Sequence, residues 1–260
     1  MSSFFRNLFG GKKKSASKVT KKAISRRLEL LGLEERITPA VAASFNTGTG
    51  TLLLASTGAD TFSVSSDAAG VVTITGTTVT AADASVTVNS GAVTVVSGAS
   101  NVKVINLTGD GNAQNITLSG INSTAFNADF GFSFAVGAGN DTLNLGGNIA
   151  LKGSGTFSAI SSTGIDAMNL GAGSDLTLTS ASGAINLAPA GLSGTFVTLN
   201  NNATINSTSG DVTLLSSSTS GSNIAGASKN LTINSGSGKA AVANTINALG
   251  NLTVTSTATP

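Results

Sequence analysis

Short runs of alternating apolar and polar residues recur along most of this chain. The clearest are Leu231-Thr232-Ile233 and Leu252-Thr253-Val254, and Gly, Asn or Ser residues flank both. Alternate side chains of a strand point to opposite faces, so these runs predict β-strands with aliphatic residues on one face and Thr on the other. The phrase that begins at Asn230 returns at Asn251. Strand-sized runs that return at a near-constant step are typical of a stacked repeat.

Similar runs fill residues 44–260. Those that start at 175, 196, 211, 230 and 251 predict a repeat unit of about 20 residues with turns of variable length. Parallel stacking would place equivalent strands about 4.8 Å apart and bury the aliphatic face between neighbouring units. The pattern therefore predicts an all-β fold, a parallel β-helix or β-solenoid. The alternative is an antiparallel β-sandwich array, which the scarcity of Asn-Gly hairpin signals disfavours.

The composition fits such a scaffold and leaves few residues for catalysis. Only 10% of the residues are charged, 40% are hydrophobic, and His, Cys, Trp and Tyr are absent. The apolar share is too high for a disordered chain. Without His and Cys the commonest general bases and thiol nucleophiles are missing, and no Glu follows Glu35. We therefore predict that the protein is not an enzyme.

The charge is divided between the two parts of the chain. The first forty residues hold 10 of the 14 Lys and Arg residues, whereas the remainder holds four Lys and nine Asp. The basic character therefore belongs to the N-terminal segment, and the acidic remainder argues against a nucleic-acid partner.

The N-terminal segment, residues 1–43, is predicted to be a separate basic leader. Ile24, Leu28 and Leu31 fall on one face of a helix that Ser17 would cap, and the opposite face is basic. Three interpretations stay open. The helix lies on an anionic membrane surface, or it is recognised only by export machinery. The third is that the segment is a basic tail that binds nucleic acid.

A motif at 27–40 resembles the N-terminal leader of large exported proteins of planctomycete bacteria, a Leu-Glu, Leu-Glu, Arg, Pro pattern after a basic region. The matching residues are Leu28, Glu29, Leu33, Glu34, Arg36 and Pro39. The resemblance implies export to the cell surface or the exterior. The segment lacks the apolar core of about 7–15 residues that an ordinary secretory signal needs. Ala40-Val41-Ala42 matches a small-residue cleavage site.

The repeats at 140–257 resemble those of filamentous-haemagglutinin-type adhesins and autotransporter passengers. That resemblance implies a right-handed parallel β-helix displayed outside the cell, where it would meet extracellular surfaces or glycans. The repeats end without a recognisable cap, which predicts that this chain is either the front of a longer protein or meets a partner at this end, for example by end-to-end association.

Two Gly-rich turns are candidates for calcium binding. Gly137-Ala138-Gly139-Asn140-Asp141 resembles the calcium-binding nonapeptide, and a partial copy runs from Gly171 to Asp175. Such sites need carboxylates from consecutive turns, and the two copies start too far apart in the sequence for that. We therefore expect no cofactor, and we interpret both Gly-rich segments as residues that favour a tight turn before a strand. The alternative function is a secreted calcium-stabilised or carbohydrate-active β-helix.

The body also carries a Phe-rich strip and repeated Thr phrases. The Phe residues at 126, 130, 132 and 134 form a strip that we predict to be buried. Thr-x-Thr phrases such as Thr253-Val254-Thr255 allow an ice-binding interpretation, which the irregular step between them disfavours.

Overall fold

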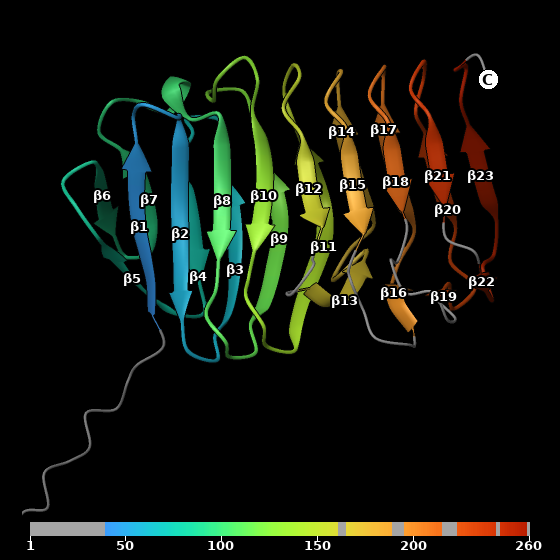
Figure 1. The fold of residues 1–260 in the computed structure, drawn as a ribbon, viewed down its shortest axis with the longest axis horizontal. Helices are drawn as coiled ribbons and strands as arrows, with labels where there is room; N and C mark the ends of the chain where they lie inside the picture. Colours follow the sequence, from blue (N-terminus) through green and yellow to red (C-terminus); the bar gives the residue numbers. More distant parts are fainter. Residues whose placement is uncertain (1–39, 161–164, 189–194, 215–222, 243–244, 259–260) are drawn as a thin grey trace, which may run out of the picture. The chain divides into compact units, whose positions relative to one another are not determined.

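The computed structural model describes residues 40–160, 165–188, 195–214, 223–242 and 245–258, and these residues are almost entirely β-structure (Figure 1). A single 3-10 turn at Ala99–Asn101 is the only helical element among them. The predicted all-β class is therefore correct. The leader residues 1–39 lie outside the described residues.

The strands form two sheets. Sheet A has nine strands, in the order β21 (Ala240–Val242), β18 (Val212–Leu214), β15 (Ile185–Ala188), β12 (Phe157–Ile160), β10 (Gly131–Ala135), β8 (Val104–Thr108), β2 (Thr51–Thr57), β1 (Ala40–Asn46) and β5 (Thr78–Ala81). The main path of the 14-stranded sheet B runs through β22 (Thr245–Asn247), β19 (Asn223–Ala225), β16 (Thr195–Leu199), β13 (Ile165–Leu170), β11 (Asp141–Ala150), β9 (Asn115–Ile121), β3 (Thr61–Ser66), β4 (Val72–Thr75), β7 (Ala92–Val95) and β6 (Val86–Asn89). From β11 a branch of sheet B continues through β14 (Leu176–Ser180), β17 (Ala203–Ser207), β20 (Leu231–Asn234) and β23 (Leu252–Thr255).

From β8 onward the paired strands are parallel, and they recur in a fixed order. From β12 onward, successive segments each place one strand in sheet A, one in the main path and one in the branch, as in β12–β13–β14 and β15–β16–β17. In the segment before them, β10 lies in sheet A and the long strand β11 pairs with both β13 and β14. We call each segment from β8–β9 onward a layer. Neighbouring layers lie side by side along the long axis of Figure 1.

The repeat is longer than the sequence suggested. Val104 pairs with Gly131, and hydrogen bonds between neighbouring layers join residues that are 27 positions apart, as at Gln114 and Asp141. The runs that start near 175, 196 and 211 are β14, β16 and β18, which belong to different paths. The predicted unit of about 20 residues was wrong because similar strand phrases occupy all three positions of a layer.

The phrase at 230 and 251 is a true pair, although its step is unusually short. Leu231 lies opposite Leu252, and Asn230 is hydrogen-bonded to Asn251. This pair suggested the shorter unit because it joins the last two strands of the branch, which are separated by fewer residues than the paired strands of the earlier layers.

Alternation places the aliphatic residues between the sheets, as predicted. Register partners in sheet A form a continuous buried column, made up of Ile105, Phe132, Phe157, Ile185 and Val212. The burial predicted for the Phe strip is confirmed. Phe130 is fully buried, and its ring stacks on Phe126 at a centroid distance of 4.2 Å.

The first part of the chain departs from parallel stacking. β1 pairs antiparallel with β2, and β3, β4, β7 and β6 pair antiparallel in succession. β1 begins at Ala40, before the predicted boundary at 43, and Val41 and Ala43 are fully buried in it. The small-residue match at 40–42 therefore lies within a core strand.

The last layer, β21–β22–β23, pairs on one side only within the described residues. Leu252 and Val254 are 44% and 45% exposed, whereas their partners Leu231 and Ile233 are fully buried.

Candidate functional site

The six residues of the predicted export motif lie outside the described residues. They are Leu28, Glu29, Leu33, Glu34, Arg36 and Pro39. The two calcium candidates, Asp141 and Asp175, are both described.

Asp141 begins β11 and is buried at a corner where three layers meet. Its Oδ1 accepts a hydrogen bond of 2.6 Å from the backbone N–H of Gln114, and its own N–H donates to Oδ2 of Asp166 at 2.8 Å. The carboxylates therefore satisfy backbone donors of neighbouring layers, as short polar side chains do at turns.

Two oxygens at this corner have no hydrogen-bond partner among the described residues, Oδ2 of Asp141 and Oε1 of Gln114. Burial raises the pKa of Asp141, and the nearby carboxylates of Asp166 and Asp110 raise it further. The pKa of Asp110 shifts in the opposite direction. The backbone N–H groups of Asn112 and Gly58 donate to it and lower its pKa to about 2.

Asp175 lies at a different corner, just before β14. Its Oδ1 accepts from the N–H of Asn202 at 3.1 Å, Oδ1 of Asn202 accepts from the N–H of Asn230 at 3.0 Å, and Oδ1 of Asn230 accepts from Nδ2 of Asn251 at 3.2 Å. The structure does not bring Asp141 and Asp175 together. In the described part of the chain, no group of three or more Asp, Glu, His or Cys residues is placed to hold a metal ion.

A third corner carries a motif that was not recognised in the sequence. Ser180, Ser207 and Ser235 each stand at the start of a Ser-x-x-Gly phrase, which ends at Gly183, Gly210 and Gly238 respectively. The hydroxyl of Ser180 donates to the carbonyl of Gly183 at 2.9 Å, and that of Ser235 to the carbonyl of Gly238 at 2.7 Å. These three phrases start 27 and 28 residues apart, but the same spacing of Ser and Gly also occurs at 161–164 and 218–221, so the phrase alone does not identify the repeat in the sequence.

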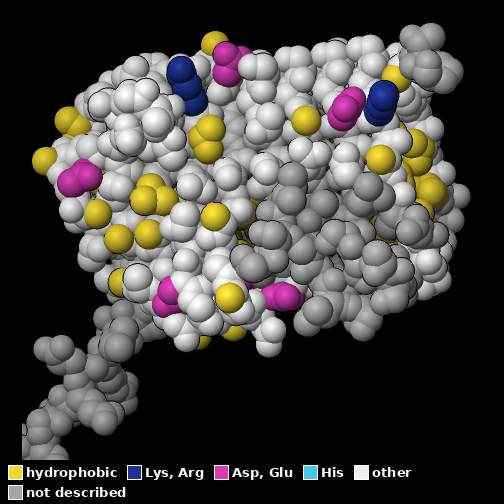
Figure 2. Space-filling view, viewed as in Figure 1, with side chains coloured by type: hydrophobic (Ala, Val, Ile, Leu, Met, Phe, Trp, Pro, Cys, Tyr) yellow, Lys and Arg dark blue, Asp and Glu magenta, His cyan; other side chains and the backbone are white. Residues whose placement is uncertain are grey.

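The outward faces carry rows of hydroxyl and amide side chains. In the branch of sheet B, four Thr residues from adjacent strands share one row: Thr177, Thr204, Thr232 and Thr253. In the main path, Nδ2 of Asn144 donates to Oδ1 of Asn115 at 2.6 Å, and Nδ2 of Asn169 donates to Oδ1 of Asn144 at 2.8 Å. Charged side chains are few on the face shown in Figure 2.

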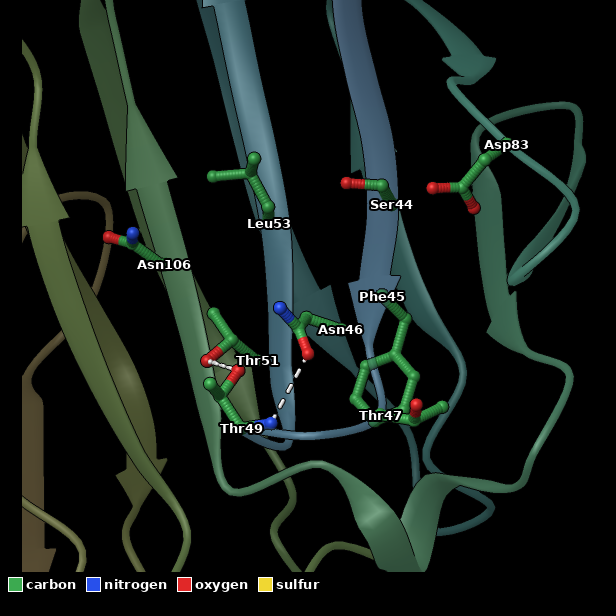
Figure 3. A pocket seen from close by; sticks show the side chains of 9 residues that line it. All are labelled: Ser44, Phe45, Asn46, Thr47, Thr49, Thr51, Leu53, Asp83 and Asn106. Atoms are coloured by element: carbon green, nitrogen blue, oxygen red, sulfur yellow. Dashed lines mark hydrogen bonds between the residues drawn. The ribbon is translucent and has the colours of Figure 1, made fainter.

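A hollow of about 590 Å³ opens on the outer face of β1, β2 and β8 (Figure 3). Ser44, Leu53 and Asn106 are register partners, so they form a row across its floor. The remaining lining residues are Phe45, Asn46, Thr47, Thr49, Thr51 and Asp83.

Local hydrogen bonds hold the rim of the hollow. Oδ1 of Asn46 accepts from the N–H groups of Gly48 at 2.9 Å and Thr49 at 3.2 Å. The hydroxyl of Thr49 donates to that of Thr51 at 2.9 Å.

Across the hollow, Asp83 is fixed by Ser85. The hydroxyl and the backbone N–H of Ser85 both donate to Oδ1 of Asp83 and lower its pKa. The hydroxyl oxygen of Ser85 in turn accepts from the N–H of Phe45 at 2.7 Å, which ties this turn to β1. Asp83 therefore presents a carboxylate that stays ionised at neutral pH.

Comparison of the chain with protein-family models, with curated proteins and with solved structures finds no match. No helix among the described residues is both long enough and apolar enough to cross a membrane.

Proposed function

We propose that this protein is an exported, cell-surface β-solenoid that acts as a structural or adhesin-like module without catalysis. The observation that carries the proposal is the parallel pairing of strands in successive layers from β8 onward. A right-handed connection, the usual hand for parallel strands, would wind the successive layers into a right-handed parallel β-helix.

The register determines what the surface offers to a partner. Because equivalent residues stack about 4.8 Å apart, each outward position becomes a row rather than an isolated side chain. The row on sheet A consists of Asn106, Ser133, Ser158, Asn186 and Thr213. Such rows supply many neutral hydrogen-bonding groups, and adhesion through them would sum many weak contacts.

The export part of the proposal is supported by the leader-like motif around Arg36 and by the acidic, weakly charged body. The motif has a clear role in a leader, whereas a basic nucleic-acid-binding tail does not need its Leu-Glu pairs.

Surface labelling tests the location. An epitope tag is inserted after Gly111, an exposed turn position, and the full chain is expressed in a planctomycete host. We expect intact cells to bind the antibody and to lose the tag on protease treatment. A matched chain with Leu28→Ser and Leu33→Ser should stay inside the cell. Labelling of the unaltered chain only after permeabilisation would contradict export.

A retention assay tests the adhesive role. Beads that carry the purified full chain should adhere to polysaccharide-coated surfaces more strongly than beads that carry an unrelated protein of similar net charge. Equal retention of the two would leave no support for adhesion.

A further inference from the structure

The outward residues of the branch of sheet B form a two-dimensional array. Its first row is the Thr row of β14, β17, β20 and β23, which are neighbouring strands (Figure 1). A second row lies two residues further along the same strands and consists of Thr179, Asn206, Asn234 and Thr255. We call these eight residues the Thr face. The irregular step that disfavoured an ice-binding interpretation of the sequence is therefore a property of the connections between the strands, and the surface itself is regular.

Parallel pairing determines the spacing of the Thr face. Neighbouring parallel strands lie about 4.8 Å apart, and residues two positions apart along one strand are about 6.6 Å apart. Register partners lie opposite one another, so the outward side chains follow a nearly rectangular lattice with these two steps. Both steps are close to the repeat distances of the water oxygens on a prism face of hexagonal ice.

The hydroxyl groups of the first row are available to water. No described residue forms a hydrogen bond with any of these four Thr side chains. In the main path, by contrast, the amides of Asn115, Asn144 and Asn169 are hydrogen-bonded to one another. A Thr hydroxyl can donate once and accept twice, so each can hold a water molecule at a fixed position. The second row is less uniform, since Oδ1 of Asn234 accepts from the N–H of Gly236 at 3.0 Å.

The four strands of the Thr face contain no charged and no aromatic residue. Their sequences are LTLTS, ATINS, LTIN and LTVT. A charged group such as an ammonium would keep a strong hydration shell of its own and disturb a water lattice. Aromatic rings are the side chains best suited to cover the flat apolar faces of sugar rings, so their absence argues against a crystalline polysaccharide.

We infer that the Thr face binds ice. A ligand that matches this array must itself repeat in two directions, and a small molecule would contact only a few of its positions. The inner faces of the same strands are packed, because Leu178, Ile205 and Ile233 are fully buried. Close packing below the strands holds the outward side chains in place. Ice binding goes beyond the proposed structural or adhesin-like role and does not depend on it, since it is a property of the folded body alone.

Two assays on the purified full chain test the inference, with ice itself as the probe. We expect the chain to be enriched in a slowly grown ice crystal relative to the remaining liquid, and to keep the crystals of a frozen film small during annealing. An unrelated protein of similar net charge should be excluded from the ice and should let the crystals grow. The inference is overturned if the full chain behaves like the unrelated protein.

Paired variants locate the face. Thr204→Tyr/Thr232→Tyr places two bulky rings at the centre of the first row, so ice can no longer approach it and both effects should be lost. Ser158→Tyr/Asn186→Tyr is the matched control, because these residues are outward register partners on neighbouring strands of sheet A. The control should behave as the unaltered chain does. Equal ice binding by the two double variants would overturn the inference.

Single substitutions keep the test decisive if a double variant does not fold. Thr232→Lys should abolish retention in ice, because the ammonium keeps its own hydration shell, whereas Asn186→Lys should not. Circular dichroism and the unfolding temperature should stay unchanged in both. Retention of both Lys variants would contradict the inference. Binding to suspended crystalline cellulose without retention in ice would assign the Thr face to a polysaccharide instead.

Discussion

At the scale of single residues, short Asp and Asn side chains hold the corners between layers. Asp141, Asp175 and Asn202 each accept a backbone N–H from a neighbouring layer. These contacts satisfy turn donors that no strand partner reaches. Carboxylates are therefore tolerated at corners where they replace a missing backbone acceptor. Asp141 is only partly satisfied in this way, because its second oxygen lies buried without a partner among the described residues.

We predict that Asp141→Asn stabilises the protein at pH 7. The pKa of Asp141 is raised in the folded chain, mainly by burial. Its contribution to stability is therefore fully present below the unfolded pKa of about 3.9 and is lost as the pH rises through the folded value. A neutral amide of the same shape avoids this loss, so thermal unfolding should shift upward by about 2–4 °C at pH 7 and hardly at pH 3.

Asp175→Asn is the control, since that carboxylate lies at an exposed corner. If Asp141→Asn lowers the unfolding temperature equally at both pH values, the charge of Asp141 carries no cost.

At the scale of elements, glycines allow the corners of successive layers to approach closely. A Cβ on Gly183 would lie 1.9 Å from the carbonyl oxygen of Gly155, and one on Gly210 would lie 2.2 Å from that of Gly183. Only a residue without a side chain fits between these backbones.

We predict that Gly183→Ala destabilises the fold by about 1–3 kcal/mol, the usual cost of forcing extra atoms into a packed region. Urea unfolding followed by circular dichroism measures the change. Gly111→Ala is the matched control, because a Cβ there meets no atom within 4 Å. Comparable midpoints for both variants would show that the corner is not tightly packed.

Alternation was enough to predict the strands and their inward faces. Leu231-Thr232-Ile233 forms β20 with Thr232 facing outward, as its pattern indicates. The repeat length could not be obtained in the same way, because strands of all three paths use the same phrase. The Thr residues at 177, 204, 232 and 253 share one row and follow the true repeat except at the last, shorter step, but similar phrases from the other two paths lie between them in the sequence.

The hollow could not be predicted from local patterns. It joins Asp83, which follows β5, to Asn106 of β8, and the antiparallel pairing of β1 with β2 lies between them. The sequence pattern gives no indication of where the first strands of the chain depart from parallel stacking. The Ser-x-x-Gly phrase is visible in the sequence, but its further copies at 161–164 and 218–221 hide the step between the three that share a corner.

At the scale of the whole molecule, the two calcium candidates do not come together to form one site. Asp141 and Asp175 lie at different corners, and each already accepts a backbone N–H group. We predict that a calcium chelator leaves the circular dichroism spectrum and the unfolding temperature unchanged. Melting on chelation, with recovery when calcium is restored, would favour the calcium-stabilised alternative instead.

The parallel stack of layers is the feature on which the proposed function depends, and introduced cysteine pairs test it most directly. The natural chain has no Cys, so two substitutions create the only thiols. Thr204 and Thr232 are register partners in β17 and β20, so their Cα atoms lie within the roughly 4.4–6.8 Å that a disulfide spans. Thr213 is closer to Thr232 in the sequence than Thr204 is, but it lies in the other sheet.

Under mild oxidation the Thr204→Cys/Thr232→Cys chain should lose its free thiols while it remains monomeric. The Thr213→Cys/Thr232→Cys chain should keep them. Rapid intramolecular crosslinking of the second pair, with none in the first, would contradict the layered register.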